Sequence, residues 1–196
     1  MDTRAAGLKT HWNGVLYERP PHCLFGGADW DCSAQSFMVA CMKKKIDLTA
    51  VPAQTGCNYP QPLDQPCNDQ SSQRLARHAG LTLFGVNLTV IGPGAWSSQR
   101  HWHSHEDEFV WVLEGELTLV TDTGDEVLRA GDCAAFRRGN PDGHHLVNKS
   151  GRPAKVLEIG NSDPQDRCVY PDVDMVAEPG VPGYSHRDGT PYPVKR

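Results

Sequence analysis

The sequence predicts an all-β protein built around one small antiparallel barrel or sandwich. Three observations support this fold class. From residue 81 onward, short apolar runs of strand length recur along the chain. Turn-forming glycines, asparagines and prolines separate these runs, and no convincing helical period lies between them. A chain of 196 residues is long enough for one such domain with extensions, and the sequence shows no internal repeat that would indicate two.

Residues 1–41 differ from the rest of the sequence. They show no sustained period and contain the breaks Pro20-Pro21 and Gly26-Gly27, whereas Met42 begins a run typical of a natural N-terminus. We interpret 1–41 as a flexible leader or a start-site artefact, with an arm that packs on a partner subunit as the alternative. Residues 42–80 are rich in prolines and polar residues, and we expect them to wrap the outside of the domain as loops.

The barrel is expected over residues 81–162. Its strands are predicted at six short apolar runs, and turn signals such as Gly92-Pro93-Gly94 and Ser150-Gly151 separate them. The six runs are residues 81–91, 108–121, 125–132, 133–138, 144–150 and 154–160.

The tail over 163–196 is expected to form an extended strap across the barrel surface, with disorder as the alternative. From Tyr170 onward it has five prolines and no period. Four large side chains give it something to bury: Tyr170, Met175, Tyr184 and Tyr192.

Composition argues against several classes of partner. The formal net charge is −5 and the only basic run is Lys43-Lys44-Lys45, which disfavours nucleic acid and anionic membranes as partners. No apolar run approaches the length of a membrane span, and the first residues lack the apolar core of a signal peptide. The seven cysteines are odd in number and form no CxxC pair, which indicates free thiols in a reducing compartment. We therefore expect a cytoplasmic protein.

The chemistry is concentrated in QRHWHSHEDEFVWVLEGE, residues 99–116. His101 and His103 are two apart, so on a strand both imidazoles project from one face, about 6–7 Å apart along the backbone. Two imidazoles at that spacing can converge on one metal ion. Glu108 has the opposite parity, so a bend between 104 and 107 has to turn it inward. An acid at the edge of an apolar face is costly unless it is paired or binds a metal.

This stretch resembles the first motif of the cupin superfamily. In that motif a glycine precedes HxH, a glutamate follows after four residues, and a second glycine follows after six more. His101, His103 and Glu108 occupy the three ligand places, and Gly94 and Gly115 occupy the two glycine places. His105 offers an overlapping HxH pair, but the interval to Glu108 favours 101 with 103.

The second cupin motif is also matched at its ends. Gly131 opens it, and Asn148 follows His144 at the expected interval of four. The middle departs from the family pattern, since Arg137 stands where proline is usual and extra residues precede the histidine. His145 is therefore an alternative to His144, although the interval to Asn148 favours His144.

The resemblance implies a single cupin-type double-stranded β-helix, which is a jelly-roll barrel, with extended arms at both ends. It also implies one divalent metal ion per subunit, with Fe(II) as the first choice and Mn, Ni, Co or Zn as alternatives. His101, His103, Glu108 and His144 would be the ligands. A homodimer is implied too, with outer apolar faces such as Phe109 and Trp111 paired across subunits.

Three functions remain open, all acting on a small-molecule substrate or ligand. They are an Fe(II)-dependent dioxygenase, a metal-dependent sugar (phosphate) isomerase or lyase, and a non-catalytic ligand-binding protein. Isomerase chemistry needs a base that is not a metal ligand. The sequence provides only weak candidates for this base, namely His105, Glu106 and Tyr170. We therefore favour the oxygenase. Arg100 and Arg137 could clamp an anionic substrate, although arginine at the protein surface is the commoner case.

Overall fold

The computed structural model describes residues 10–12, 15–17 and 44–193, in a chain that divides into two units, Met1–Met42 and Lys43–Arg196. In the first unit, two short strands, β1 (Thr10–Trp12) and β2 (Val15–Tyr17), pair antiparallel. The rest of the segment interpreted as a leader or an arm lies outside the described residues. All further description concerns the second unit.

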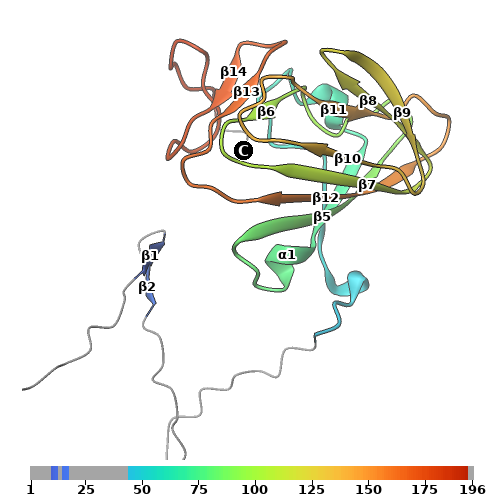
Figure 1. Cartoon of the computed structure of the whole chain (residues 1–196), viewed down its shortest axis with the longest axis horizontal. Coiled ribbons are helices and arrows are strands. Elements are labelled where there is room, and N and C mark those ends of the chain that lie inside the picture. Colours follow the sequence, from blue (N-terminus) through green and yellow to red (C-terminus); the bar gives the residue numbers. More distant parts are fainter. Residues whose placement is uncertain (1–9, 13–14, 18–43, 194–196) are drawn as a thin grey trace, which may run out of the picture. The chain divides into compact units, whose positions relative to one another are not determined.

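The second unit consists largely of antiparallel strands (Figure 1). Its largest sheet has six strands in the order β10-β7-β12-β5-β4-β3. These are β3 (Ala53–Thr55), β4 (Gln70–Arg74), β5 (Phe84–Ile91), β7 (Glu108–Glu114), β10 (Cys133–Phe136) and β12 (Ala154–Asn161).

Two smaller sheets, ordered β11-β8-β9 and β14-β13-β6, complete the unit. Their strands are β6 (Trp102–His103), β8 (Glu116–Thr121), β9 (Gly124–Arg129), β11 (His145–Val147), β13 (Cys168–Tyr170) and β14 (Met175–Ala177). Helix is confined to α1 (Leu75–His78) and the 3₁₀ turns η1 (Leu48–Ala50) and η2 (Gln65–Cys67). Among the described residues, no helix has the length and apolarity needed to cross a membrane.

The predicted all-β class is confirmed, and each of the six predicted runs contains at least one strand. Five strands of the second unit lie outside these runs, and two of them, β3 and β4, widen the six-stranded sheet. β4 reads QSSQR, without any apolar residue, yet it pairs with β5 along its whole length, and β3 pairs with β4 in turn. Backbone hydrogen bonds join this polar segment to β5, one strand from the edge that β3 forms.

The main core lies between the six-stranded sheet and the sheet β11-β8-β9. It is formed by inward-facing residues of both layers: Ile91, Val110, Val112, Leu117, Leu119, Leu128, Leu146 and Val156. β7 shows the expected alternation. Val110 and Val112 are buried in this core, whereas Trp111 and Leu113 are 47% and 39% exposed on the outer face.

The turn from β7 into β8 depends on Gly115. Its φ of +81° lies in the left-handed region that side chains other than glycine rarely adopt. A Cβ atom there would lie 2.9 Å from Cα of Ala154 and 3.0 Å from the carbonyl oxygen of Pro153. The close approach of this turn to the start of β12 therefore excludes a larger residue.

The tail contributes two strands and packs several of its large side chains against the barrel. β13 pairs with both β6 and β14, which lie together at one end of the barrel (Figure 1). Tyr170 and Met175 are buried in a second apolar cluster, with Tyr59 beside them and Tyr184 packed against it. Arg187 Nη2 donates to the carbonyl oxygens of Tyr170, Pro171 and Val173, which holds the strap in a compact turn.

Candidate metal centre and adjoining cavities

Three short segments bring the histidines and Glu108 together. His101 and His144 face each other across an antiparallel bridge, with N–H to carbonyl distances of 3.1 and 2.9 Å in the two directions. Paired residues of neighbouring strands project their side chains from the same face. His103 belongs to β6. Glu108 begins β7 after a bend at 104–107, which was expected because Glu108 and the two histidines would otherwise lie on opposite faces of one strand.

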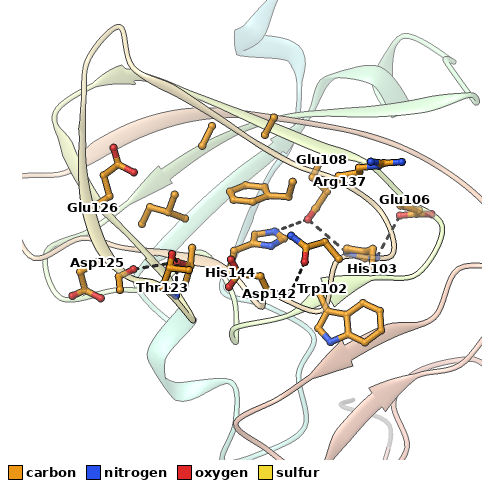
Figure 2. Close-up of a pocket in the computed structure, with 17 residues that line it drawn as sticks. Trp102, His103, Glu106, Glu108, Thr123, Asp125, Glu126, Arg137, Asp142 and His144 are labelled. Atoms are coloured by element: carbon orange, nitrogen blue, oxygen red, sulfur yellow. Dashed lines mark hydrogen bonds and ion pairs between the residues drawn. The ribbon is translucent and has the colours of Figure 1, made fainter.

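The imidazoles converge on one oxygen atom, Oε2 of Glu108. Nε2 of His144 lies 2.8 Å from it, Nε2 of His101 3.6 Å, and Nε2 of His103 3.8 Å. Figure 2 shows Glu108 between His144 and His103, with dashed lines to both. Ligand atoms of His101, Glu108 and His144 all lie within 4.8 Å of one another, which is the size of a mononuclear metal site.

The opposite ring nitrogens of two histidines are held by the protein. Nδ1 of His101 lies 2.9 Å from the carbonyl oxygen of Gln99, and Nδ1 of His103 lies 2.6 Å from Oδ2 of Asp166. Both partners are acceptors, so these bonds assign the ring proton to Nδ1 and leave the lone pair of Nε2 facing Glu108. Such outer contacts orient metal-binding histidines in proteins.

This proton assignment fits a cation at the centre. In the neutral rings the two Nε2 lone pairs are available to a divalent ion, which would replace the proton that can otherwise lie between a ring and Glu108. His144 is held differently, since its ring stacks on Phe136 with 3.5 Å between centroids and 2° between planes. Its buried Nδ1 has no hydrogen-bond partner among the described residues, so Nε2–H can donate to Glu108 while no ion is bound.

The electrostatics of the cluster keep the carboxylate charged. Burial raises the pKa of Glu108, but the bonds from His101 and His144 outweigh burial and hold that pKa well below its usual range. Burial lowers the pKa of His101, yet the bond and the charge of Glu108 produce a net rise. For His144 burial prevails, and its pKa is lowered. Glu108 is therefore an anionic donor at neutral pH.

The structure also separates the alternatives that the sequence left open. His105 is exposed, and its Nδ1 contacts the Ser104 hydroxyl at 2.8 Å. His145 is buried against the Trp96 ring, with its Nδ1 2.9 Å from the Ser98 carbonyl oxygen. Neither makes a contact with Glu108. The four predicted ligands, His101, His103, Glu108 and His144, are thus brought together, and their binding of a metal stays a prediction.

Sequence reasoning missed Cys168, which enters the site from the strap. It pairs with His103 in the β13–β6 register, and its thiol lies within 4.8 Å of ring nitrogens of His101 and His103. Burial raises the pKa of this thiol strongly. Cys168 is therefore a protonated thiol while no metal is bound, and the predicted donor set consists of the nitrogen and oxygen atoms of the three histidines and Glu108.

Two cavities meet at the candidate centre, and Glu108 and His144 line both. We call the first the acidic cavity; its volume is about 520 Å³ and it is drawn in Figure 2. Its wall carries Trp102, Glu106, Asp125, Glu126, Arg137 and Asp142. We call the second the Glu158 cavity; its volume is about 620 Å³. Its wall carries Arg74, Asn87, Ser98, His101, Glu158 and Asn161.

Glu158 is the second residue that sequence reasoning missed. It lies on β12 beside the candidate centre, and its Oε2 accepts a hydrogen bond of 2.8 Å from the Thr89 hydroxyl. Burial raises the pKa of its carboxyl to about 7. In the sequence it stands within the run AKVLEIG, where an acid on a strand gives no sign of which face it occupies.

The two arginines singled out in the sequence have different positions. Arg100 is occupied by ion pairs: its Nε and Nη2 each lie 2.7 Å from an oxygen of Asp172, and Nη1 contacts Asp122. It therefore joins the strap to the turn after β8 rather than facing a ligand. Arg137 is exposed on the wall of the acidic cavity.

Comparisons with known proteins agree with this architecture. The family model "Cupin domain" matches residues 87–160. A cupin-superfamily sugar phosphate isomerase from Silicibacter pomeroyi is 42% identical, with a TM-score of 0.72, covering 76% of this chain and 96% of that one. A putative sugar phosphate isomerase from Acidithiobacillus ferrooxidans is 27% identical, with a TM-score of 0.57, covering 65% and 81%. The predicted cupin jelly-roll class is confirmed.

A polyketide cyclase from Streptomyces resistomycificus has the same fold at 21% identity and a TM-score of 0.52, covering 62% of this chain and 81% of that one. A search of curated proteins finds no match to this sequence. Chemistry beyond the fold therefore depends on the residues of the site.

Proposed function

We propose, on the premise that this chain belongs to the cupin superfamily, that it is a metal-dependent isomerase of a small sugar phosphate. One observation carries the proposal. Glu158 places a carboxyl that is not a metal ligand on the wall of the cavity that also contains His101, Glu108 and His144. The two similar structures that are described as sugar phosphate isomerases support the substrate class.

His101, His103, Glu108 and His144 would hold the metal, through three nitrogen donors and one carboxylate oxygen. This set suits Fe(II), Mn(II), Ni(II), Co(II) or Zn(II) and leaves coordination positions for substrate. A divalent ion bound there would polarise a substrate carbonyl or hydroxyl as a Lewis acid. Asp166, through its 2.6 Å contact with His103, would keep that ring in its binding orientation.

Glu158 would move the proton. Interconversion of an aldose and a ketose takes a proton from one carbon, returns a proton to the neighbouring carbon, and shifts a proton between the two oxygens. No oxidant or co-reactant is consumed. Burial raises the pKa of this carboxyl to about 7 in the metal-free protein, and a carboxyl on the cavity wall can accept and return the protons. The Thr89 hydroxyl, 2.8 Å from Oε2, would hold the carboxyl in place between the two transfers.

Glu158 also changes the balance among the three functions considered from the sequence. The Fe(II)-dependent dioxygenase was favoured there because no adequate base could be named. That reason no longer applies, since the Glu158 cavity contains one. The dioxygenase stays an untested prediction, and a non-catalytic ligand-binding barrel is the outcome if no substrate is turned over.

The test combines metal analysis with turnover. Protein purified without added ions is analysed for metal, beside His103→Ala and His144→Ala, and is then assayed with aldose phosphates under argon. We expect about one equivalent of a divalent metal, lost in both variants, and isomerisation without oxygen. Product formation that requires oxygen would establish the dioxygenase instead. Absence of metal even after reconstitution would refute the site.

Two glutamate variants then separate the base from the metal site. Glu158→Gln is expected to keep the metal and lose about 10²- to 10⁴-fold in kcat. Glu114→Gln is the matched control, because Glu114 is exposed on β7 and pairs with Lys155 at 2.6 Å. Equal activity of the two variants would exclude Glu158 as the base.

A homodimer is part of the proposal. Trp111 and Leu113 are large apolar residues exposed on the outer face of the six-stranded sheet, and such faces pair across subunits in many assemblies. Light scattering is expected to give twice the mass of the chain. A monomer at micromolar concentration would remove this part of the proposal and leave the catalytic part intact.

A further inference from the structure

A row of polar residues crosses the six-stranded sheet beside the candidate centre. In the strand register, Arg74 on β4 is paired with Asn87 on β5, and Asn87 is paired with Glu158 on β12. Glu158 is paired in turn with Val110 on β7. Residues paired in this way project from one face of a sheet, and Val110 is buried in the core. The row therefore lies on the inner face of the sheet, with Arg74 at its solvent-exposed end.

Arg74 lies on a cavity wall without an ionic partner among the residues that the structure describes. It lines the Glu158 cavity together with Asn87 and Glu158, and no other lysine or arginine among the described residues lines that cavity. No ion pair joins Arg74 to another described residue. A smaller cavity of about 310 Å³ is lined by the same three side chains and offers further room beside the guanidinium. An uncompensated arginine on a cavity wall is a binding site for an anion.

The spacing of the row matches a sugar phosphate. Neighbouring strands lie about 4.8 Å apart, so Arg74 and Glu158 are separated by two strand spacings, or about 10 Å between Cα atoms. A chain of about five carbons with a phosphate ester spans about 8 Å at bond lengths near 1.5 Å. With its reacting carbons near Glu158, such a molecule reaches the guanidinium with its phosphate.

The acidic cavity is a poor alternative for an anion. Its wall carries Glu106, Asp125, Glu126 and Asp142 against a single cation, Arg137 (Figure 2). Like charges repel a phosphate, and the Glu158 cavity carries fewer of them: Glu106, Glu108 and Glu158 line it together with Arg74. In the strand register, neutral Asn87 stands between Arg74 and Glu158. The phosphate is therefore expected in the Glu158 cavity, at the end where Arg74 lies, and not in the acidic cavity.

We infer that Arg74, with Asn87 beside it, binds the phosphate group of the substrate, which enters the Glu158 cavity with its reacting carbons toward the candidate metal centre. This inference rests on the proposed function for the identity of the substrate. The anion-binding site itself rests only on the placement of Arg74 beside Asn87 and on the positive charge of Arg74. Arg74 is thus a specificity residue, which selects phosphorylated over neutral sugars.

Binding of inorganic phosphate and of glycerol phosphate tests the subsite directly. Both probes are titrated calorimetrically into the full chain, with and without reconstituted metal. Arg74→Gln is expected to weaken binding about ten- to hundredfold in both forms, since a bidentate charged contact is lost. Arg74→Lys keeps the positive charge but loses the two-pronged guanidinium group. Its affinity for the probes is expected to lie between those of the wild type and Arg74→Gln. Arg74 is exposed and makes no side-chain cap to α1, so these variants retain the fold.

Two matched variants locate the site. Arg77→Gln changes an exposed arginine on α1 that does not line the Glu158 cavity, and it is expected to bind both probes like the wild type. Arg137→Gln removes the cation of the acidic cavity and is expected to have no effect. Loss of binding in Arg137→Gln, or binding that requires metal and is insensitive to Arg74→Gln, would overturn the inference.

Kinetics separate this inference from the proposed function. If the chain isomerises a sugar phosphate, Arg74→Gln is expected to raise KM about tenfold or more with little change in kcat. The wild type and Arg74→Gln should convert the corresponding unphosphorylated sugar with the same KM and kcat. Turnover with an unchanged KM in Arg74→Gln would refute the subsite alone. Arg74-dependent phosphate binding without turnover of any sugar phosphate would refute the isomerase and leave the subsite standing.

Discussion

Replacement of Glu158 by glutamine is expected to make the metal-free protein more stable at alkaline pH. The folded protein raises the pKa of this carboxyl from 4.5 to about 7 because the group is buried. Between these values the folded state binds more protons than the unfolded chain. Stability is therefore full below about pH 4.5 and falls as pH rises through about 7, where the buried group has to ionise.

The size of the effect follows from the shift. At about 1.4 kcal/mol per pKa unit, a rise from 4.5 to about 7 corresponds to roughly 3.5 kcal/mol of lost stability above pH 7. Glutamine carries no charge at any pH, so Glu158→Gln avoids this loss and keeps a side chain of the same size. Its stability relative to the wild type should rise by about 3 kcal/mol between about pH 4 and pH 9.

Denaturant unfolding followed by circular dichroism over this pH range, with chelator present, measures the difference. Glu114→Gln serves as the control, because an exposed ion pair such as that of Glu114 with Lys155 contributes at most about 1 kcal/mol. Added divalent metal should reduce the gain, since a nearby cation stabilises the ionised carboxylate. A stability difference that does not change with pH would show that Glu158 titrates normally and would remove the case for it as a neutral-pH base.

Three further expectations concern the surroundings of the site. Cys168→Ser should keep one equivalent of metal by elemental analysis, because His101, His103, Glu108 and His144 make up the predicted donor set without the thiol; loss of metal would make Cys168 a ligand. Arg100→Ala should cost about 1–2 kcal/mol of unfolding free energy, since it breaks the paired contact with Asp172, and an unchanged midpoint in urea would contradict this. Gly115→Ala should cost about 1–3 kcal/mol in the same measurement, because φ is +81° and the new Cβ meets Ala154; a stability loss under about 0.5 kcal/mol would show that the turn relaxes.

The fold was predictable where side-chain periodicity carried the information. The alternation of β7, with Val110 and Val112 inside and Trp111 outside, follows directly from the sequence. β4 was not predictable, because QSSQR joins the sheet through its backbone and has no apolar face to reveal it. Arg74 lies at the end of this strand, so its position on the cavity wall was hidden for the same reason.

The candidate centre was predictable in part. His101, His103, Glu108 and His144 were identified by motif spacing, which reflects neighbouring strands and a single bend. Contacts across long sequence separations were beyond that reasoning. Among them are Asp166 at His103 and Cys168 beside it, both brought by the strap.

Glu158 shows a different limit. Its neighbours in the run AKVLEIG predict a strand but do not say which face the acid occupies. Only pairing with Asn87 and Val110 places it toward the interior. Candidate bases drawn from the sequence alone therefore omitted the one carboxyl that now favours an isomerase.

The pairing of β6 with β13 has a consequence for when the proposed metal would bind during synthesis. His101 and His103 leave the ribosome about sixty residues before Asp166 and Cys168, which hold the β6 segment in place. A nascent chain that ends before β13 exposes unrestrained imidazoles to whichever metal is abundant. Selective metallation is therefore expected to be a late, largely post-translational event, governed by docking of residues 163–196 rather than by the order in which the ligands are made.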